Sequence, residues 1–344
     1  MSGPFFARHT PSTVPANSNR LVGVRAFGHR VGAISTSSFA QLGGVVLRFA
    51  DAFEGLLHRE FAHPFNIGSD ALRDCASNES HQGTETKQIL TTLSTSQVRA
   101  GFVQCDLYRG IAAGLPADKV FFSPFPLART SIVVATKAWF LLDADSRETR
   151  LQRYLNEELE ALHDAPFDPD DEASRKYVET RTADYLAIGA TADLRLGLRK
   201  NPKSWHAPFL VHSGQRDTEA PASETQLVRK MFLASGFGSE DDAGMPYSLL
   251  SAATHGRFNH AGLSEHTPVG PSENGVTMSA LHTSLDVTAR VTVLSAITTL
   301  TYLRALARYM NVPQGLVRQQ LQEPTLAWSA IAKVQVPEWL RRTD

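Results

Sequence analysis

The chain has 344 residues, of which 42% are apolar and 20% charged, as is typical of a globular protein with a substantial core. A formal net charge of −1 gives no overall field that would attract nucleic acid or an anionic membrane. The two cysteines have no CxxC metal spacing and cannot define a disulfide framework, which favours a reducing compartment. No run approaches the ~18 to 20 apolar residues of a membrane span, and the N-terminus lacks the apolar core of a signal peptide. We therefore expect a cytoplasmic protein without a membrane segment.

The N-terminal part of the chain predicts a tail followed by two long helices. Residues 1–20 are rich in Pro, Ser, Thr and Asn, so we expect a disordered tail before a single domain over residues 21–344. Apolar side chains at three- and four-residue steps predict a helix from Ser37 or Ser38 to shortly before Pro64. Residues 64–84 are turn-rich, and a second helical pattern then runs to Gly114.

The middle of the chain predicts three further helices. Residues 125–142 are apolar almost all round, which is typical of a helix inside a bundle. A turn with Asp145 or Ser146 as N-cap begins the next helix, and the short connection makes the two antiparallel neighbours. A charged, exposed helix then follows an acidic turn and is expected to reach about Leu196.

The C-terminal half predicts more helices and two long loops. We expect loops over residues 197–221 and 257–280, which exceed the ~2 to 8 residues usual between bundle helices. Between them lie a helix whose Ser223 and Gln226 have the spacing of a capping box, and the helical stretch MPYSLLSAATHG. A long apolar helix ending before Pro313 and one or two short helices complete the chain. The fold predicted is an all-α bundle of about eight helices.

Three blocks between residues 85 and 310 resemble a family of proteins. They are ARTSIVVATKAWFLLDADSRETRLQR, YSLLSAATHG and the Leu/Ala-rich helix after GVTMSALHTSLD. This combination is similar to uncharacterised helical proteins of high-GC Gram-positive bacteria, a domain of unknown function that is loosely HEPN-like. The family has no settled activity, so the resemblance implies a helical fold rather than a reaction.

The chain departs from two patterns that the resemblance implies. HEPN ribonucleases carry an Arg four to six residues before a His on one helix, whereas here those positions before His255 are Ser251, Leu250 and Leu249. The related proteins are expected to have an acidic residue one turn after the equivalent of Arg129, where this chain has Val133.

The first candidate site lies in SLLSAATHGRFNH. His255 ends an apolar helix, where an imidazolium interacts favourably with the terminal carbonyls, by up to ~2 kcal/mol in good geometry. Arg257 and His260 follow at the edge of the second loop, and such residues can bind an anion and transfer a proton near neutral pH. With Arg129 from the start of the buried helix, this group would suit a phosphate or carboxylate ligand. The alternative is that His255 stabilises the C-terminal end of its own helix and takes no part in binding or catalysis.

A second candidate is a metal site built from two Glu-x-x-His spacings. The pairs are Glu60 with His63 and Glu160 with His163, each at the end of a predicted helix. A spacing of i, i+3 places both side chains on one helical face, as in di-iron carboxylate bundles, so iron or manganese is the cofactor of this alternative. The other interpretation is a pair of solvated helix ends and no cofactor.

Three functions remain open from the sequence. The first is a structural, regulatory or assembly protein that forms a homo-oligomer or binds a protein partner through its apolar helix faces. The second is a HEPN-like nuclease or nucleotide-processing protein, although basic residues are scattered rather than gathered into a stripe. The third is a metal-dependent oxidase. No GxGxxG, P-loop, GxSxG or HExxH spacing occurs in the sequence.

Overall fold

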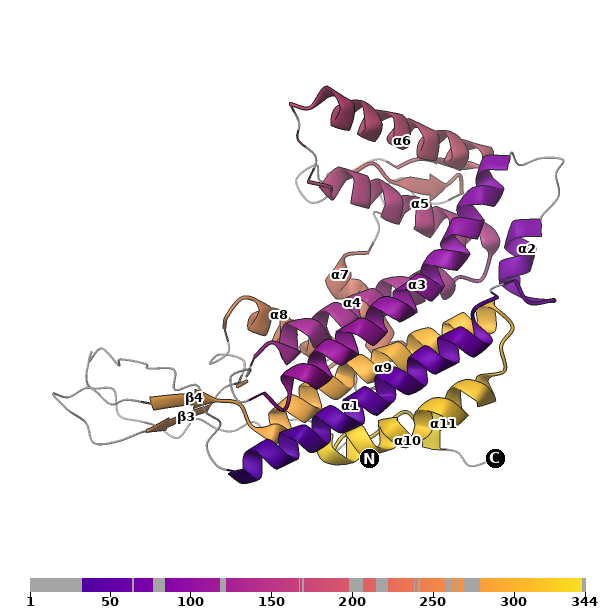
Figure 1. Cartoon of the computed structure of the whole chain (residues 1–344). Helices are drawn as coiled ribbons and strands as arrows, with labels where there is room; N and C mark the ends of the chain where they lie inside the picture. Colours follow the sequence, from indigo (N-terminus) through magenta and orange to yellow (C-terminus); the bar gives the residue numbers. More distant parts are fainter. Residues whose placement is uncertain are drawn as a thin grey trace.

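The body of the protein is a bundle of long helices that lie side by side (Figure 1). The computed structural model describes residues 33–63, 65–76, 84–117, 122–166, 168, 170–197, 207–214, 222–237, 239–240, 242–257, 262–263, 265–268 and 279–341. The bundle consists of α1 (Ala33–Glu60), α3 (Thr84–Gly114), α4 (Pro124–Leu142), α9 (Leu285–Tyr309) and α10 (Gln314–Ala332). The expectation of an all-α protein is confirmed at this level.

Helix α9 lies at the centre of the bundle, because 19 of its 25 residues are buried. Its serine and threonine hydroxyls are accommodated there by bonding to the carbonyls of their own helix, as Thr292 does to Thr288 at 2.7 Å. Neighbouring helices approach closely where glycine replaces a side chain. A Cβ on Gly101 of α3 would lie 2.9 Å from the methyl carbons of Leu57 on α1.

The described residues contain eleven helices rather than the eight expected. The turn-rich stretch after Pro64 holds a short helix, α2 (Asp70–Ala76), which the sequence analysis did not predict. The C-terminal helices are α10, which has 19 residues despite Pro324, and α11 (Glu338–Arg341), so only the second is short. Helix α1 begins at Ala33, before the two serines proposed as its N-cap.

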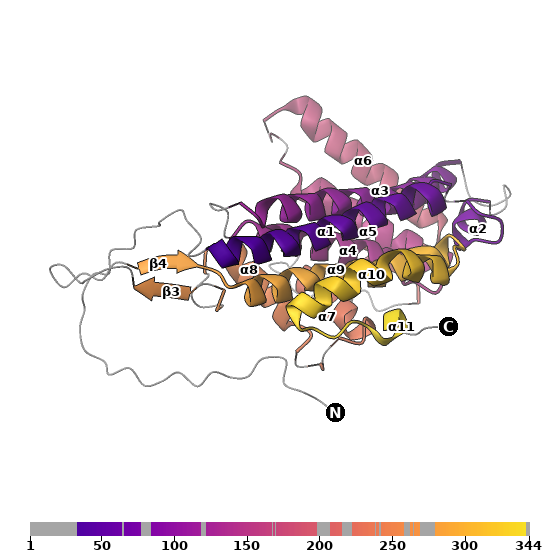
Figure 2. The same ribbon diagram turned by 60° about the horizontal axis from the view of Figure 1, so that its bottom comes forward.

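A helical hairpin projects from the bundle as an arm. It consists of α5 (Arg147–Asp164) and α6 (Glu172–Thr191), and α6 stands away from the bundle in both views (Figures 1 and 2). Helix α6 ends five residues before Leu196, because the chain passes through Asp193 with φ 57° and continues as strand β1 (Leu194–Leu196). The prediction of one helix up to Leu196 was therefore wrong at its end.

The described parts of both predicted loop regions contain short strands, which the sequence analysis did not predict. Strand β1 pairs antiparallel with β2 (Leu210–His212). Side chains of α5 bind β2 from its other side, since Asn156 accepts from the Leu210 amide at 2.6 Å and donates to its carbonyl at 3.0 Å. Strands β3 (Glu265–Pro268) and β4 (Ser279–His282) form a second antiparallel pair beyond the end of the bundle (Figure 2).

Two shorter helices pack against α4. Helix α7 (Glu224–Ala234) starts with the predicted capping box, in which Ser223 and Gln226 bond reciprocally. Helix α8 (Met245–Thr254) begins with proline in its first turn, as expected.

Both cysteines are free and buried. The predicted tail over residues 1–20 lies outside the described residues.

The length and apolar content of α4 resemble those of a membrane-spanning helix more than the sequence analysis indicated. Among the described helices it is the one whose length and apolar content would allow it to cross a membrane, with a mean hydropathy of 1.2. More than half of that window, 56%, is buried inside the structure. The core helix of a bundle meets the same criteria, so this is weak evidence for a membrane.

Candidate functional site

The end of α8 is a Schellman motif, in which a glycine with positive φ reverses the chain. Gly256 has φ 71°, its amide bonds to the Ala253 carbonyl at 3.1 Å, and the Arg257 amide bonds to the Ala252 carbonyl at 2.8 Å. His255 is the C-cap residue, and the side chains of His255 and Arg257 are exposed. His260, the third member of this predicted site, lies outside the described residues.

Arg129 is held in a different cluster, on α4. Its Nη2 donates to the Tyr247 hydroxyl at 2.7 Å and lies 3.2 Å from a carboxylate oxygen of Glu224, and the guanidinium stacks over the Tyr247 ring. Glu224 therefore supplies the acidic partner that the sequence analysis sought at Val133. The cluster ties α4 to the starts of α7 and α8.

The structure does not place Arg129 with His255. Tyr247, the contact of Arg129, and His255 lie eight residues apart along α8, which corresponds to about 12 Å of helix rise. The anion site expected from these residues is thus divided between the two ends of α8. His255 with Arg257 stays a prediction for one end, and Arg129 is engaged in helix packing at the other.

The two Glu-x-x-His spacings have different surroundings. Helix α1 ends at Glu60, so His63 lies beyond it and the helical geometry assumed for this pair is wrong. Glu160 and His163 are both on α5, where burial raises the pKa of Glu160, and His163 is exposed. Among the described residues no three or more His, Cys, Asp or Glu side chains gather as a group that could hold a metal ion.

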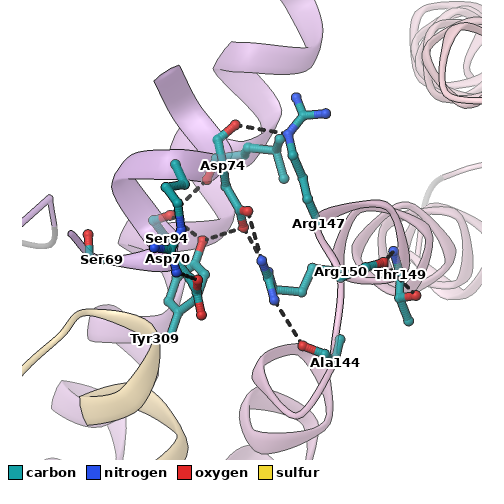
Figure 3. A network of polar contacts seen from close by, with 12 residues as sticks. Ser69, Asp70, Asp74, Ser94, Ala144, Arg147, Thr149, Arg150 and Tyr309 are labelled. Carbon is teal, nitrogen blue, oxygen red and sulfur yellow. Dashed lines mark hydrogen bonds and ion pairs between the residues drawn. The ribbon is translucent and has the colours of Figure 1, made fainter. Parts of the chain in front are cut away.

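A buried ion pair that the sequence analysis missed joins the arm to the bundle (Figure 3). Arg150 of α5 donates from Nε and Nη2 to the two carboxylate oxygens of Asp74 on α2, at 2.7 and 2.8 Å. Arg150 is 5% exposed and Asp74 2%. A third guanidinium hydrogen bond reaches the Ala144 carbonyl at 2.9 Å, and Arg147 donates to the Asp74 carbonyl at 3.1 Å.

The ion pair is extended into the bundle by Tyr309 of α9. The Tyr309 hydroxyl donates to Asp74 at 3.1 Å and lies 2.9 Å from the Ser94 hydroxyl on α3. Burial, together with the negative charge of Asp74, holds the pKa of Tyr309 above its usual value. Burial alone lowers the pKa of Arg150, but the hydrogen bonds and charge of Asp74 outweigh it and raise that pKa. One polar cluster therefore connects α2, α3, α5 and α9.

A local sequence pattern could not have located this cluster. Asp74 and Arg150 are 76 residues apart, and α2 was read as part of a turn region. The local signal is weak, because Arg150 lies between Thr149 and Leu151, and Asp74 lies between Arg73 and Cys75. The cluster restricts movement of the arm relative to the bundle, because separating Arg150 from Asp74 would leave a buried charge without a partner.

The far end of the arm is exposed. Only Tyr185, Ile188 and Gly189 of the twenty residues of α6 are buried, and they all lie in its last third. Tyr185 fixes that part by donating to Glu158 of α5 at 2.9 Å. In the first part of the helix, residues 172–184, Tyr177 has 53% of its surface exposed. We call residues 172–184 the outer segment of α6.

Comparison of the chain with protein-family models, with curated proteins and with solved structures gives no match.

Proposed function

We propose that this protein is a helical assembly protein that forms a homodimer through the outer segment of α6. The observation that carries the proposal is the exposure of this segment, which has no buried residue over thirteen positions. Helices shorter than ~12 to 15 residues are marginal in water, and a helix that is polar all round usually bridges to another unit or is supported by ion pairs. Within the segment, Arg181 pairs with Asp184 at 3.4 Å, and a partner would supply the remaining support.

The charge of the protein fits a second copy as this partner. A net charge of −1 over the whole chain gives little repulsion between copies. The outer segment contains three acidic and three basic residues, in the order Glu172, Arg175, Lys176, Glu179, Arg181, Asp184. A two-fold axis makes each surface meet itself, so a patch with both signs of charge can pair with its own copy.

The positions of two exposed residues define the register of the pair. Arg175 and Glu179 are one turn apart on the same side of α6. Two copies running antiparallel about the height of Tyr177 set Arg175 of each copy beside Glu179 of the other. Tyr177 lies two residues from each of them, on the opposite side of α6, and is outside this contact.

The base of the arm supports the same role. The Asp74–Arg150 pair and Tyr309 hold α5 against the bundle, and Asn156 holds β2 along α5. A preorganised surface loses less conformational entropy when it binds. The arm therefore presents α6 in a fixed orientation.

The test is the mass of the full chain in solution over a range of concentrations, by light scattering after size exclusion. The wild type is expected to pass from monomer to dimer as the concentration rises. Glu179→Arg places a second positive charge beside Arg175 of the other copy and should weaken the dimer by at least about 10-fold in Kd. Ile67→Asp is the matched control, because Ile67 is 91% exposed and lies between α1 and α2. A wild type that stays monomeric, or equal effects of both substitutions, would contradict the proposal.

A further inference from the structure

An arginine that has no counter-ion among the described residues lies near the end of the central helix. Arg304 of α9 is half-buried, and its guanidinium carbon lies 5.0 Å from the centre of the Trp339 ring on α11. Its Nε is buried and has no hydrogen-bond partner. Within the described part of the chain, no carboxylate forms an ion pair with it, in contrast to Arg290 on the same helix, which pairs with Asp286 at 2.8 Å.

The nearest charge that acts on Arg304 has the same sign. Arg308 follows one turn later, and its own partner is Asp143 at 3.1 Å. Burial, followed by the positive charge of Arg308, lowers the pKa of Arg304. The C-terminal end of a helix favours cations, which explains why two arginines occur here, but it does not explain why the more buried of the two has no anionic partner.

Helix α11 fixes the position of the guanidinium. Leu340 of this helix is buried, and its carbonyl accepts a hydrogen bond from Gln322 of α10 at 2.8 Å. Trp339 is thereby held against Arg304, so the ring covers one face of the planar guanidinium, its Nε is buried, and within the described residues no acceptor bonds to its Nη1 or Nη2. An arginine fork held in this way matches the oxygens of a carboxylate or phosphate.

We infer that Arg304, held by Trp339, binds an oxyanion, the phosphate or carboxylate group of a small ligand. The oxyanion accepts from the Nη1 and Nη2 groups of Arg304 and compensates its charge, whereas Arg308 already pairs with Asp143. This site lies on α9 and α11, and it is independent of the dimer proposed through α6.

The experiment is a titration of the full-length protein with inorganic phosphate and, separately, with citrate, by calorimetry at constant ionic strength. Saturable binding of the wild type is expected, and Arg304→Gln should raise the Kd by about 10- to 100-fold, the range for hydrogen bonds to a charged group. Arg304→Lys keeps the charge and loses the fork, so an intermediate Kd is expected. Arg290→Gln, on the same helix, should leave the Kd within about 2-fold.

The pattern of binding identifies the source of the oxyanion. Binding of phosphate alone indicates a phosphate ligand, binding of citrate alone a carboxylate ligand, and binding of both a general oxyanion site. The inference is overturned if neither probe saturates below about 50 mM, or if wild type and Arg304→Gln, both folded by circular dichroism, bind equally.

Discussion

Arg150 and Asp74 form a two-point ion pair in the interior, with Nε–Oδ2 at 2.7 Å and Nη2–Oδ1 at 2.8 Å. They come from α5 and α2, so the pair fixes the arm to the bundle at a place where solvent does not screen the charges. Tyr309 satisfies the carboxylate further. The orientation of the arm therefore depends on a charged contact rather than on apolar packing alone.

Asp74→Ala should lower the free energy of unfolding by about 3 to 5 kcal/mol, because it leaves the Arg150 charge buried without a partner. Asp70→Ala is the matched control on the same helix. Asp70 pairs with Arg73, whose side chain is 68% exposed, so a loss of less than about 1 kcal/mol is expected. Urea unfolding followed by circular dichroism measures both.

The double variant Asp74→Leu/Arg150→Met separates the cost of an unpaired charge from the value of the pair. Since an apolar replacement leaves no buried charge, the double variant should be more stable than Asp74→Ala alone. A double variant whose loss equals the sum of the losses of Asp74→Leu and Arg150→Met measured singly would show no coupling between the two residues and would contradict this expectation.

Gly256→Ala should destabilise the protein by about 1 kcal/mol, because φ 71° is unfavourable for a residue with a Cβ. Within the part of the chain that the structure describes, no heavy atom lies within 4 Å of the added methyl, so the expected cost is conformational and not steric. Gly244→Ala, at the other end of α8, has φ −85° and equal space, and it should leave stability nearly unchanged. Thermal unfolding of the two variants gives the comparison, and equal shifts in Tm would argue against the Schellman ending.

Glu160→Gln should flatten the dependence of stability on pH above about 4.5. Burial raises the pKa of Glu160 in the folded state, while the attraction of Lys137 lowers it to a smaller extent. Between the unfolded and the folded pKa the native state binds more protons than the unfolded chain, so the free energy of unfolding falls as pH rises through this window. The glutamine variant lacks that fall. Unfolding titrations from pH 4 to 8 should therefore show the wild type and the variant diverging as pH rises, and parallel curves would contradict the assigned shift.

Most of the helices could be predicted from the sequence because their signals are local. Apolar periodicity and caps predicted the long helices of the bundle, and the capping box at Ser223 predicted the start of α7. The end of α6 could not be predicted in this way, since its residues continue a helical composition into β1. There the pairing with β2 and the amide contacts of Asn156 decide the conformation.

The candidate site residues show the same difference between local signals and contacts of distant segments. His255 and Gly256 were predicted as a helix end, and their neighbours in sequence were enough to show it. The partner of Arg129 is Glu224, 95 residues away, and the partner of Arg150 is Asp74 on a helix of seven residues. Contacts between distant segments depend on the packing of whole helices, which a single sequence does not specify by local pattern.

The measurement that tests the central proposal most directly is a charge exchange at the α6 interface. Arg175→Glu alone and Glu179→Arg alone each place like charges opposite one another in the antiparallel dimer, whereas the double variant restores opposite charges. Light scattering of the full chain should show dimers for the wild type and the double variant and a loss of dimer for each single variant, by about 10-fold in Kd for two repulsive contacts. A double variant as monomeric as the single variants, or single variants that dimerise like the wild type, would contradict the account.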